Sequence, residues 1–400
     1  MAYTDLSLDS GIILISILVV FGILIYNPAK FLGIPSFIIF MGIGLFLGNG
    51  DLGDPVFDDP QLTELLSGLA LNIIIFDGGF NTSIENVKTA YKEGMILSTV
   101  GVLITAALLG GFTWLVTDLP LMSALIFGAV VSSTDAAAVF GILEARKLKL
   151  KHKTGTILEF ESATNDPMAL VLVTVLTSLS AGSGEMLSVY DLIWTFIKLI
   201  VVGLAIGIGL GLLTKIALDK ISFQENGLIP IFTLCMFFIA TYGSKLLDGN
   251  ILISSYVFGL IIGNGTYKGR ELNQSFNNSI SWMAQALMFL FLGLQIFPDQ
   301  LIRVFFISFL PAIFLILAAR PLATYLCYLP FKNIPYQKKL FIAMIGLKGA
   351  TPIVFAFIPL VKGVPNSPEI FNMVFYIVMY SIIIQGALLD PLAKKLSLKI

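Results

Sequence analysis

The sequence is poor in charge and in the side chains that most often bind metals. Asp, Glu, Lys and Arg make up 12% of its 400 residues, whereas soluble domains carry about 25%. The single histidine, His152, lies in a basic loop, which leaves little room for a histidine-based metal site or catalytic triad. The two cysteines, Cys235 and Cys327, lie in apolar runs, and we expect both to be small buried side chains rather than a disulfide. A net charge of −1 offers no basic field for nucleic acid.

Apolar residues fill the chain instead. They form 57% of it, with a mean hydropathy of +0.93, and their runs are long enough for helices, so the sequence predicts an all-α polytopic membrane protein. Residues 1–9 carry two acids and no base, which argues for a retained first span rather than a cleaved signal peptide. We expect one transmembrane domain over 1–400 and no soluble regulatory domain. Thirteen spans are predicted, at about 11–27, 35–48, 62–80, 94–117, 120–143, 155–181, 190–218, 228–247, 250–264, 275–297, 301–329, 337–361 and 370–393.

Loop charge predicts the orientation of these spans. With thirteen spans, the loops on one side of the membrane carry 18 of the 24 Lys and Arg residues, and the loops on the other side carry 3. The positive-inside rule then predicts a protein of the cell membrane with its N-terminus outside and its C-terminus in the cytoplasm. The acidic loop 51–59, which contains no base, fits the outside.

Two spans are interrupted, the fifth by the polar run SSTD at 132–135 and the twelfth by GLKGATP at 346–352. Glycine and proline loosen a helix at such points. The spacing of the two breaks suggests two inverted six-helix repeats, about 11–181 and 228–393, joined by a helix at about 190–218. Broken helices that cross near the midplane are typical of transporters, whose binding site lies at the crossing. The alternative is an ordinary bundle with a proline kink and a few inward hydroxyls.

The joining helix carries glycines at a spacing of four. Gly203, Gly207 and Gly211 would lie on one face and let another helix approach closely. This face would serve either packing within the chain or a dimer contact, and we favour packing within the chain.

Residues 156–169, TILEFESATNDPMA, place carboxylates inside a long apolar run. Ionisable side chains within a span are costly and mostly functional. In a helix, Ser162 and Asp166 share one face, and Glu161 and Asn165 share the neighbouring face. A buried carboxylate beside a hydroxyl and an amide forms an oxygen-rich cage for a monovalent cation, and a proton can displace that cation. Asp166 is therefore the predicted cation and proton site.

The other buried charges are expected to support this site. Thr134 and Ser162 are candidate neutral ligands, together with backbone carbonyls at the break, and such oxygens suit Na+ or K+. Asp135 is expected to stabilise converging helix N-termini, and Lys348 the opposing C-terminal ends, with direct ligation as the alternative for both. Asp77, in the run FDGGFN, would either contact the ion, directly or through water, or lie at the membrane interface.

Glu161 needs a basic partner, because a lone buried charge is costly. Arg320 is the first choice and Lys348 the second. A pair between Glu161 and Arg320 would be part of the scaffold, since arginine does not lose its proton in proteins. Glu159, nearer the cytoplasmic end, is expected to line the entry funnel.

Five stretches in this chain resemble the cation/proton antiporter superfamily, in particular the NhaP branch and its cell-volume-regulation potassium/proton antiporters. They keep the family's order over most of the chain. The stretches are FDGGF at 76–80, STDAAAVF at 133–140, LEFESATNDPMA at 158–169, RPLATYLCYLPF at 320–331 and GLKGATPIVFA at 346–356.

The resemblance implies an NhaA-like fold, a homodimer, and a core domain that moves against a dimerisation domain. It implies that Asp166, with Thr134, Ser162 and Asp77, holds the cation. It also implies the ion pair of Glu161 with Arg320.

The resemblance also bears on how the exchange is coupled. The pair Asn165-Asp166 resembles the signature associated with electroneutral exchange of one cation for one proton. The family usually has arginine where this chain has Lys348. The volume-regulation members usually carry a cytoplasmic ligand-sensing tail as well.

Together these features predict a secondary active antiporter that exchanges K+ or Na+ for H+ by alternating access, with no enzymatic activity and no cofactor. A monovalent cation channel is the alternative, but neither a filter loop nor a ring of pore charges is visible in the sequence. An intramembrane enzyme using Ser162 and Asp166 would lack a histidine base within a span. The ion is left open, although Asp rather than Glu at position 77 weakly favours K+.

Overall fold

The computed structural model describes residues 36–48, 58–135, 150–181, 189–221 and 224–399, with a few helical positions between residues 13 and 24. These parts of the chain are helical, with one isolated antiparallel bridge between Leu150 and Lys399. Among them, six helices are long and apolar enough to cross a membrane, and three shorter helices are also apolar. Most of the predicted span 11–27, the loop 51–57 and residues 136–149 lie outside the described residues.

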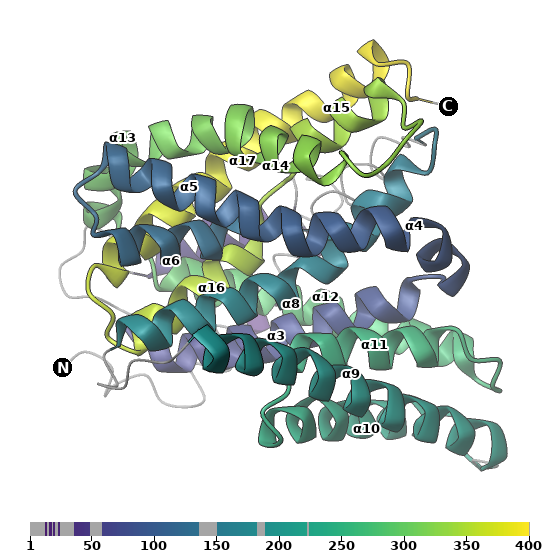
Figure 1. Cartoon of the computed structure of the whole chain (residues 1–400). Coiled ribbons are helices and arrows are strands. Elements are labelled where there is room, and N and C mark those ends of the chain that lie inside the picture. The colour runs from purple at the N-terminus through teal and green to yellow at the C-terminus, as the bar shows by residue number, and fades with distance from the viewer. Residues whose placement is uncertain are drawn as a thin grey trace.

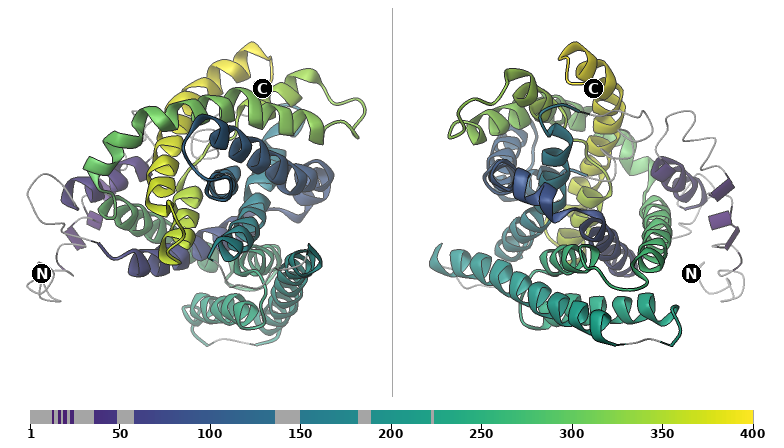
Figure 2. Two further views of the ribbon diagram at one scale, coloured as in Figure 1. Left: turned by 60° about the vertical axis from the view of Figure 1, so that its left-hand side comes forward. Right: turned by 90° about the vertical axis from the view of Figure 1, so that its right-hand side faces the viewer.

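Every span predicted from residue 35 onward contains helix, and the helices pack into two groups (Figures 1 and 2). In the first, which we call the scaffold group, α3 packs on α11 and α12, α2 on α12, and α9 on α10 and α11. The scaffold group consists of α2 (Ser36–Leu47), α3 (Pro60–Asn81), α9 (Val189–Lys220), α10 (Leu228–Leu246), α11 (Ile251–Gly263) and α12 (Arg270–Leu294).

The second group, which we call the crossing group, contains both interrupted spans. Here α5 packs on α6, α4 and α6 on α8, and α17 on α13 and α16. The crossing group consists of α4 (Ile84–Ile96), η2 (Leu97–Gly101), α5 (Val102–Val116), α6 (Leu121–Ser132), α8 (Thr154–Ser180), α13 (Pro298–Phe314), η3 (Leu315–Ala319), α14 (Arg320–Cys327), α15 (Tyr336–Met344), α16 (Ala350–Val361) and α17 (Ser367–Lys395).

Both predicted interruptions are present in the described residues. Helix α6 ends at Ser132 and the chain continues in an extended conformation at Ser133. In the other span, α15 ends at Met344 and α16 begins at Ala350. The two breaks touch, because the Asp135 backbone N–H donates to the Leu347 carbonyl at 2.8 Å. They therefore meet inside the crossing group, as the sequence predicted.

The glycine face of α9 packs within the chain. A Cβ atom added at Gly203 would lie 2.8 Å from the Asn250 carbonyl oxygen, and one added at Gly207 would lie 2.9 Å from the Ser254 carbonyl oxygen. Both contacts are with the start of α11, so the prediction of internal packing is confirmed. Without a side chain at these positions, the two helix backbones can approach this closely.

Two sequence expectations were wrong in detail. Cys327 is buried, but Cys235 is exposed on α10, because apolar residues of a membrane helix need not face the protein interior. The predicted span 94–117 begins earlier, in a helical segment Val87–Val116. The charged residues before position 94 are good helix formers and extend the helix beyond its apolar part.

Loops predicted to share a side of the membrane contact one another. On the predicted cytoplasmic side, Leu150 bridges to Lys399 and Lys338 Nζ lies 2.9 Å from Glu93 Oε2. On the predicted outer side, Gln295 Nε2 donates to Asp58 Oδ1 at 3.0 Å. These contacts agree with the predicted alternation of the loops.

Candidate cation site

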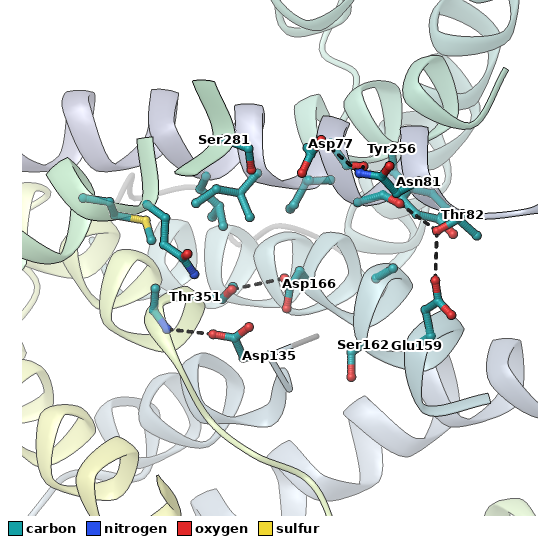
Figure 3. Close-up of a pocket in the computed structure, with 18 of the residues that line it drawn as sticks. Asp77, Asn81, Thr82, Asp135, Glu159, Ser162, Asp166, Tyr256, Ser281 and Thr351 are labelled. Carbon is teal, nitrogen blue, oxygen red and sulfur yellow. Dashed lines mark hydrogen bonds between the residues drawn. The ribbon is translucent and has the colours of Figure 1, made fainter. Parts of the chain in front are cut away.

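A cavity of about 520 Å³ lies between the scaffold group and the crossing group (Figure 3). Helices α3, α11 and α12 line one wall, and α8, Asp135 and the start of α16 line the other. Its exposed lining residues, among them Asn81 and Asn278, lie near the end of α3 that leads into Thr82. The cavity therefore opens toward the side predicted to be cytoplasmic, and its polar lining residues are Asp77, Asn81, Thr82, Asp135, Glu159, Ser162, Tyr256, Asn278, Ser281, Gln285, Asp166 and Thr351.

Asp166 lies near the middle of α8 and faces this cavity, although its side chain is only 6% exposed. The Thr351 hydroxyl, at the start of α16, donates to Asp166 Oδ2 at 3.1 Å. The other oxygen, Oδ1, has no hydrogen-bond partner among the described residues. A buried carboxylate oxygen without a partner is costly. Oδ1 is therefore the oxygen of this residue best placed to accept a cation or a proton.

Ser162 lies one helical turn before Asp166 and lines the same cavity. Its hydroxyl lies 3.0 Å from the Thr134 hydroxyl, which also accepts a hydrogen bond from the Asn165 amide. Thr134 and Asn165 are not among the described residues that line the cavity, so they lie behind Ser162. The structure thus brings the predicted ligand residues into one cluster, and of these three only Ser162 reaches the cavity.

The charges at the two breaks occupy opposite helix ends. Asp135 Oδ2 accepts a hydrogen bond from the Ala350 backbone N–H, the first residue of α16, at 3.2 Å. Lys348 Nζ donates to the carbonyl oxygens of Ser132 and Ser133, at 3.2 and 2.6 Å. A negative group at a helix N-terminus and a positive group at a C-terminus are both favourable. Asp135 thus lies at the N-terminus of α16 and Lys348 at the C-terminus of α6, where each has the favourable sign of charge.

Gly349 allows the contact between Asp135 and α16. A Cβ atom at this position would overlap the Asp135 carboxylate. No ordinary side chain would fit there without moving the carboxylate away from the α16 N-terminus. The glycine in GLKGATP is thus needed for space at the crossing.

Glu161 pairs with Arg320, as predicted. Arg320 Nη1 lies 2.5 Å from Glu161 Oε1, and both side chains are buried. Lys348, the second choice for this partner, donates to the break carbonyls instead. Glu161 and Asp166 therefore lie on the same helix in different surroundings, one in an ion pair and the other facing the cavity.

Two further acids lie on the cavity walls (Figure 3). Asp77 comes from α3, on the wall opposite Asp166, and Asn81 Nδ2 donates to its Oδ1 at 3.0 Å. At the mouth, Glu159 of α8 connects the two groups, because its Oε1 accepts a hydrogen bond of 3.5 Å from the hydroxyl of Thr82, which follows α3. The expectation that Glu159 lines the entrance agrees with this position.

Sequence reasoning missed Thr351, Tyr256 and Ser281, which also line the cavity. Thr351 lies within the break motif at 346–352, so its position next to a predicted break was a usable signal. Tyr256 and Ser281 lie within the regular helices α11 and α12. A serine hydroxyl in such a helix often bonds to its own backbone, and a tyrosine ring packs in many apolar helices, so the sequence carries no sign that these two face a cavity.

The chemistry of the donors suits a hard monovalent cation as cargo. Carboxylate and hydroxyl oxygens are the ligands that such cations prefer. In the described parts of the chain, no cluster of three or more His, Cys, Asp or Glu residues is arranged to hold a metal ion. On the α8 wall the cavity therefore offers the Asp166 oxygen that has no partner among the described residues and the Ser162 hydroxyl, with Asp77 on the opposite wall.

Comparisons with known proteins agree with this geometry. The chain is 36% identical to the K(+)/H(+) antiporter NhaP2 of Shewanella sp. (strain ANA-3) over 97% of its length and 67% of the relative's. It is 32% identical to the K(+)/H(+) antiporter NhaP of Alkalimonas amylolytica, over 98% of this chain and 68% of that one.

The fold resembles that of the sodium proton antiporter MjNhaP1 from Methanocaldococcus jannaschii. The TM-score is 0.82 at 22% identity, covering 97% of this chain and 99% of the other. The family model described as sodium/hydrogen exchanger, transmembrane, matches residues 15–395. The chain is thus a multi-pass membrane protein, and it belongs to the transmembrane sodium/hydrogen exchanger family.

Proposed function

We propose that this protein exchanges K+ or Na+ for H+ across a cell membrane by alternating access. The observation that carries the proposal is Asp166, a buried carboxylate on a cavity between two helix groups, with one oxygen that has no partner among the described residues. The names of its K(+)/H(+) antiporter relatives support the same reaction. Because a cation and a proton compete for this carboxylate, each crossing of the site carries one or the other, and the exchange is electroneutral.

The cation is held by Asp166 and Ser162 from α8. Thr134 and Asn165 hold the Ser162 hydroxyl in place through their hydrogen bonds. Asp77, on the opposite wall, contacts the ion directly or through water. A cation bound between the walls would attract Asp77 as well as Asp166, which links loading of the site to the approach of the two groups.

The remaining buried charges keep the crossing intact. Glu161 and Arg320 neutralise each other within the crossing group. Asp135 and Lys348 stabilise the helix ends exposed by the two breaks. With these charges satisfied, the cavity carboxylate can change its charge without disturbing the fold.

The architecture follows the antiporter pattern. The two halves, about 11–181 and 228–393, form inverted repeats joined by the helix at about 190–218. The break after α6 and the break before α16 cross at the site. The crossing group moves against the scaffold group, which also forms the homodimer contact. The N-terminus lies outside and the C-terminus in the cytoplasm.

Purified protein in liposomes with a preset pH gradient tests this function. Addition of Na+ or K+ should dissipate the gradient, and the Asp166→Asn variant should not respond. The comparison of the two salts also identifies the preferred ion. A current that reverses at the K+ equilibrium potential, without proton movement, would instead identify a channel.

A further inference from the structure

Asn250 lies at the start of α11, between the scaffold group and the crossing group, and is 2% exposed. Its backbone N–H donates to the Leu199 carbonyl of α9 at 2.9 Å. Its side-chain Oδ1 accepts from the backbone N–H groups of Leu252 and Ile253, at 2.8 and 3.0 Å. Asn250 is therefore the N-cap of α11 and is held firmly within the scaffold group.

The same side chain reaches across to the other group. Asn250 Nδ2 donates to the Pro167 carbonyl of α8 at 3.1 Å. The orientation of the amide is determined, since a flip would place its NH2 against two backbone N–H groups. Asn250 thus contacts the residue that directly follows Asp166.

Pro167 is a weak point of α8. It has no backbone N–H, so the helix lacks the bond that the Ala163 carbonyl would otherwise accept. Helices bend most readily at such positions. The scaffold group therefore holds α8 where this helix is loosest and where it carries the proposed cation site.

This contact lies on the far side of Asp166 from the cavity mouth. The mouth is marked by exposed Asn81 and by Glu159, which precedes Asp166 in α8. Helix α8 packs on α11 and α16 packs on α3, and the contact of Asn250 with Pro167 lies one residue beyond Asp166. Access to Asp166 from this far side requires these surfaces to separate.

We infer that the hydrogen bond from Asn250 to Pro167 is a latch that keeps the far side of the site closed. Its rupture accompanies the step that exposes Asp166 to the far side of the membrane. Asn250 is a positioning residue, which sets the balance between the two open forms without touching the ion. The inference rests on the proposed alternating access.

Two substitutions separate the latch from the helix cap. In Asn250→Ser the hydroxyl still caps α11 but is too short to reach Pro167, whereas Asn250→Ala loses both contacts. The matched control is Ser254→Ala, which removes a buried hydrogen bond of 3.1 Å from α11 to the Ala240 carbonyl within the scaffold group. A latch predicts that both Asn250 variants shift the balance and that the control does not.

The readout is accessibility, which does not depend on transport. Gly78 lines the cavity mouth, and a side chain there meets open space, so Gly78→Cys is a suitable reporter in a Cys235→Ala background. A membrane-impermeant thiol reagent is applied to the mouth side of membrane vesicles. In Asn250→Ser the ratio of mouth-open to far-side-open protein should fall by about fivefold, which slows labelling.

Ion exchange provides the second readout. In Asn250→Ser, the half-saturating cation concentration measured from the far side should fall, by up to about fivefold, because more protein is open there. Labelling of Asn250→Ser at the parent rate together with an unchanged far-side half-saturating concentration would overturn the latch. Effects seen in Asn250→Ala alone would reduce Asn250 to a helix cap and overturn it too. Equal slowing in Ser254→Ala would overturn it as well. Failure of the parent protein to exchange ions would contradict the proposed function instead, and the labelling result would still stand.

Discussion

Two faces of α8 carry acids little more than one turn apart, and the structure treats them differently. On one face Glu161 is paired with Arg320 and sealed within the crossing group. On the other, Asp166 looks into a cavity with one oxygen unpartnered among the described residues. A carboxylate matched by a permanent cation has no reason to change its charge, whereas one beside a cavity can bind a mobile cation or a proton. We therefore expect a structural role for Glu161, and the transport role that we propose for Asp166.

The largest expected effect is on the cavity face. Asp166→Asn removes the charge while keeping the shape, so ion exchange should fall to the level of protein-free liposomes. Folded yield and thermal stability should change little, because the amide can still accept from Thr351. Ion exchange retained by Asp166→Asn would contradict the assignment of Asp166 as the transport site.

The paired face should respond in stability instead. Glu161→Gln leaves Arg320 buried without a counter-charge, which should destabilise the protein by about 3–5 kcal/mol. Thermal unfolding in detergent measures this effect, and the double variant Glu161→Gln/Arg320→Gln should recover part of the loss. A well-folded Glu161→Gln protein with weakened cation affinity would contradict the scaffold role.

A change of pH should affect cation binding at Asp166, on the cavity face of α8, and not the pair of Glu161 with Arg320. The proposed competition between protons and cations at Asp166 predicts that, while this residue is mostly protonated, each further unit of acidification raises the half-saturating cation concentration about tenfold. At higher pH the dependence should flatten, because the proton no longer competes. Half-saturation measured in liposomes over a pH series tests this, and a pH-independent value would exclude competition at one site.

A smaller effect is expected from the neighbouring hydroxyl. Ser162→Ala removes one oxygen from the cavity wall and should raise the half-saturating cation concentration by about fivefold. Ser178→Ala is the matched control, since this hydroxyl lies on the same helix and donates to the Thr174 carbonyl away from the cavity. Equal effects of the two substitutions would mean that Ser162 acts through the stability of α8 and not as a ligand.

Much of this site could be predicted from the sequence, because charges inside apolar runs have few possible roles. The acid Asp166 and the pairing of Glu161 with Arg320 follow from that rule. The breaks at 132–135 and 346–352 follow from polar residues, glycine and proline inside apolar runs. The positions of Thr134 and Asn165 behind Ser162 could not be predicted in this way. The helical period of 3.6 residues predicts which residues share a helix face, but it leaves open whether that face meets a cavity or another helix.

The sequence by itself determined that the chain enters a membrane as helices, where those helices break, and which of their charges need partners. These properties depend on local composition and on the cost of charge in an apolar medium. Only the tertiary structure decided that the Thr351 hydroxyl donates to Asp166 and that the Asn250 amide donates to the Pro167 carbonyl. Both contacts join segments far apart in the chain, and they depend on how each helix is rotated and placed against its neighbour, which no local pattern of residues records.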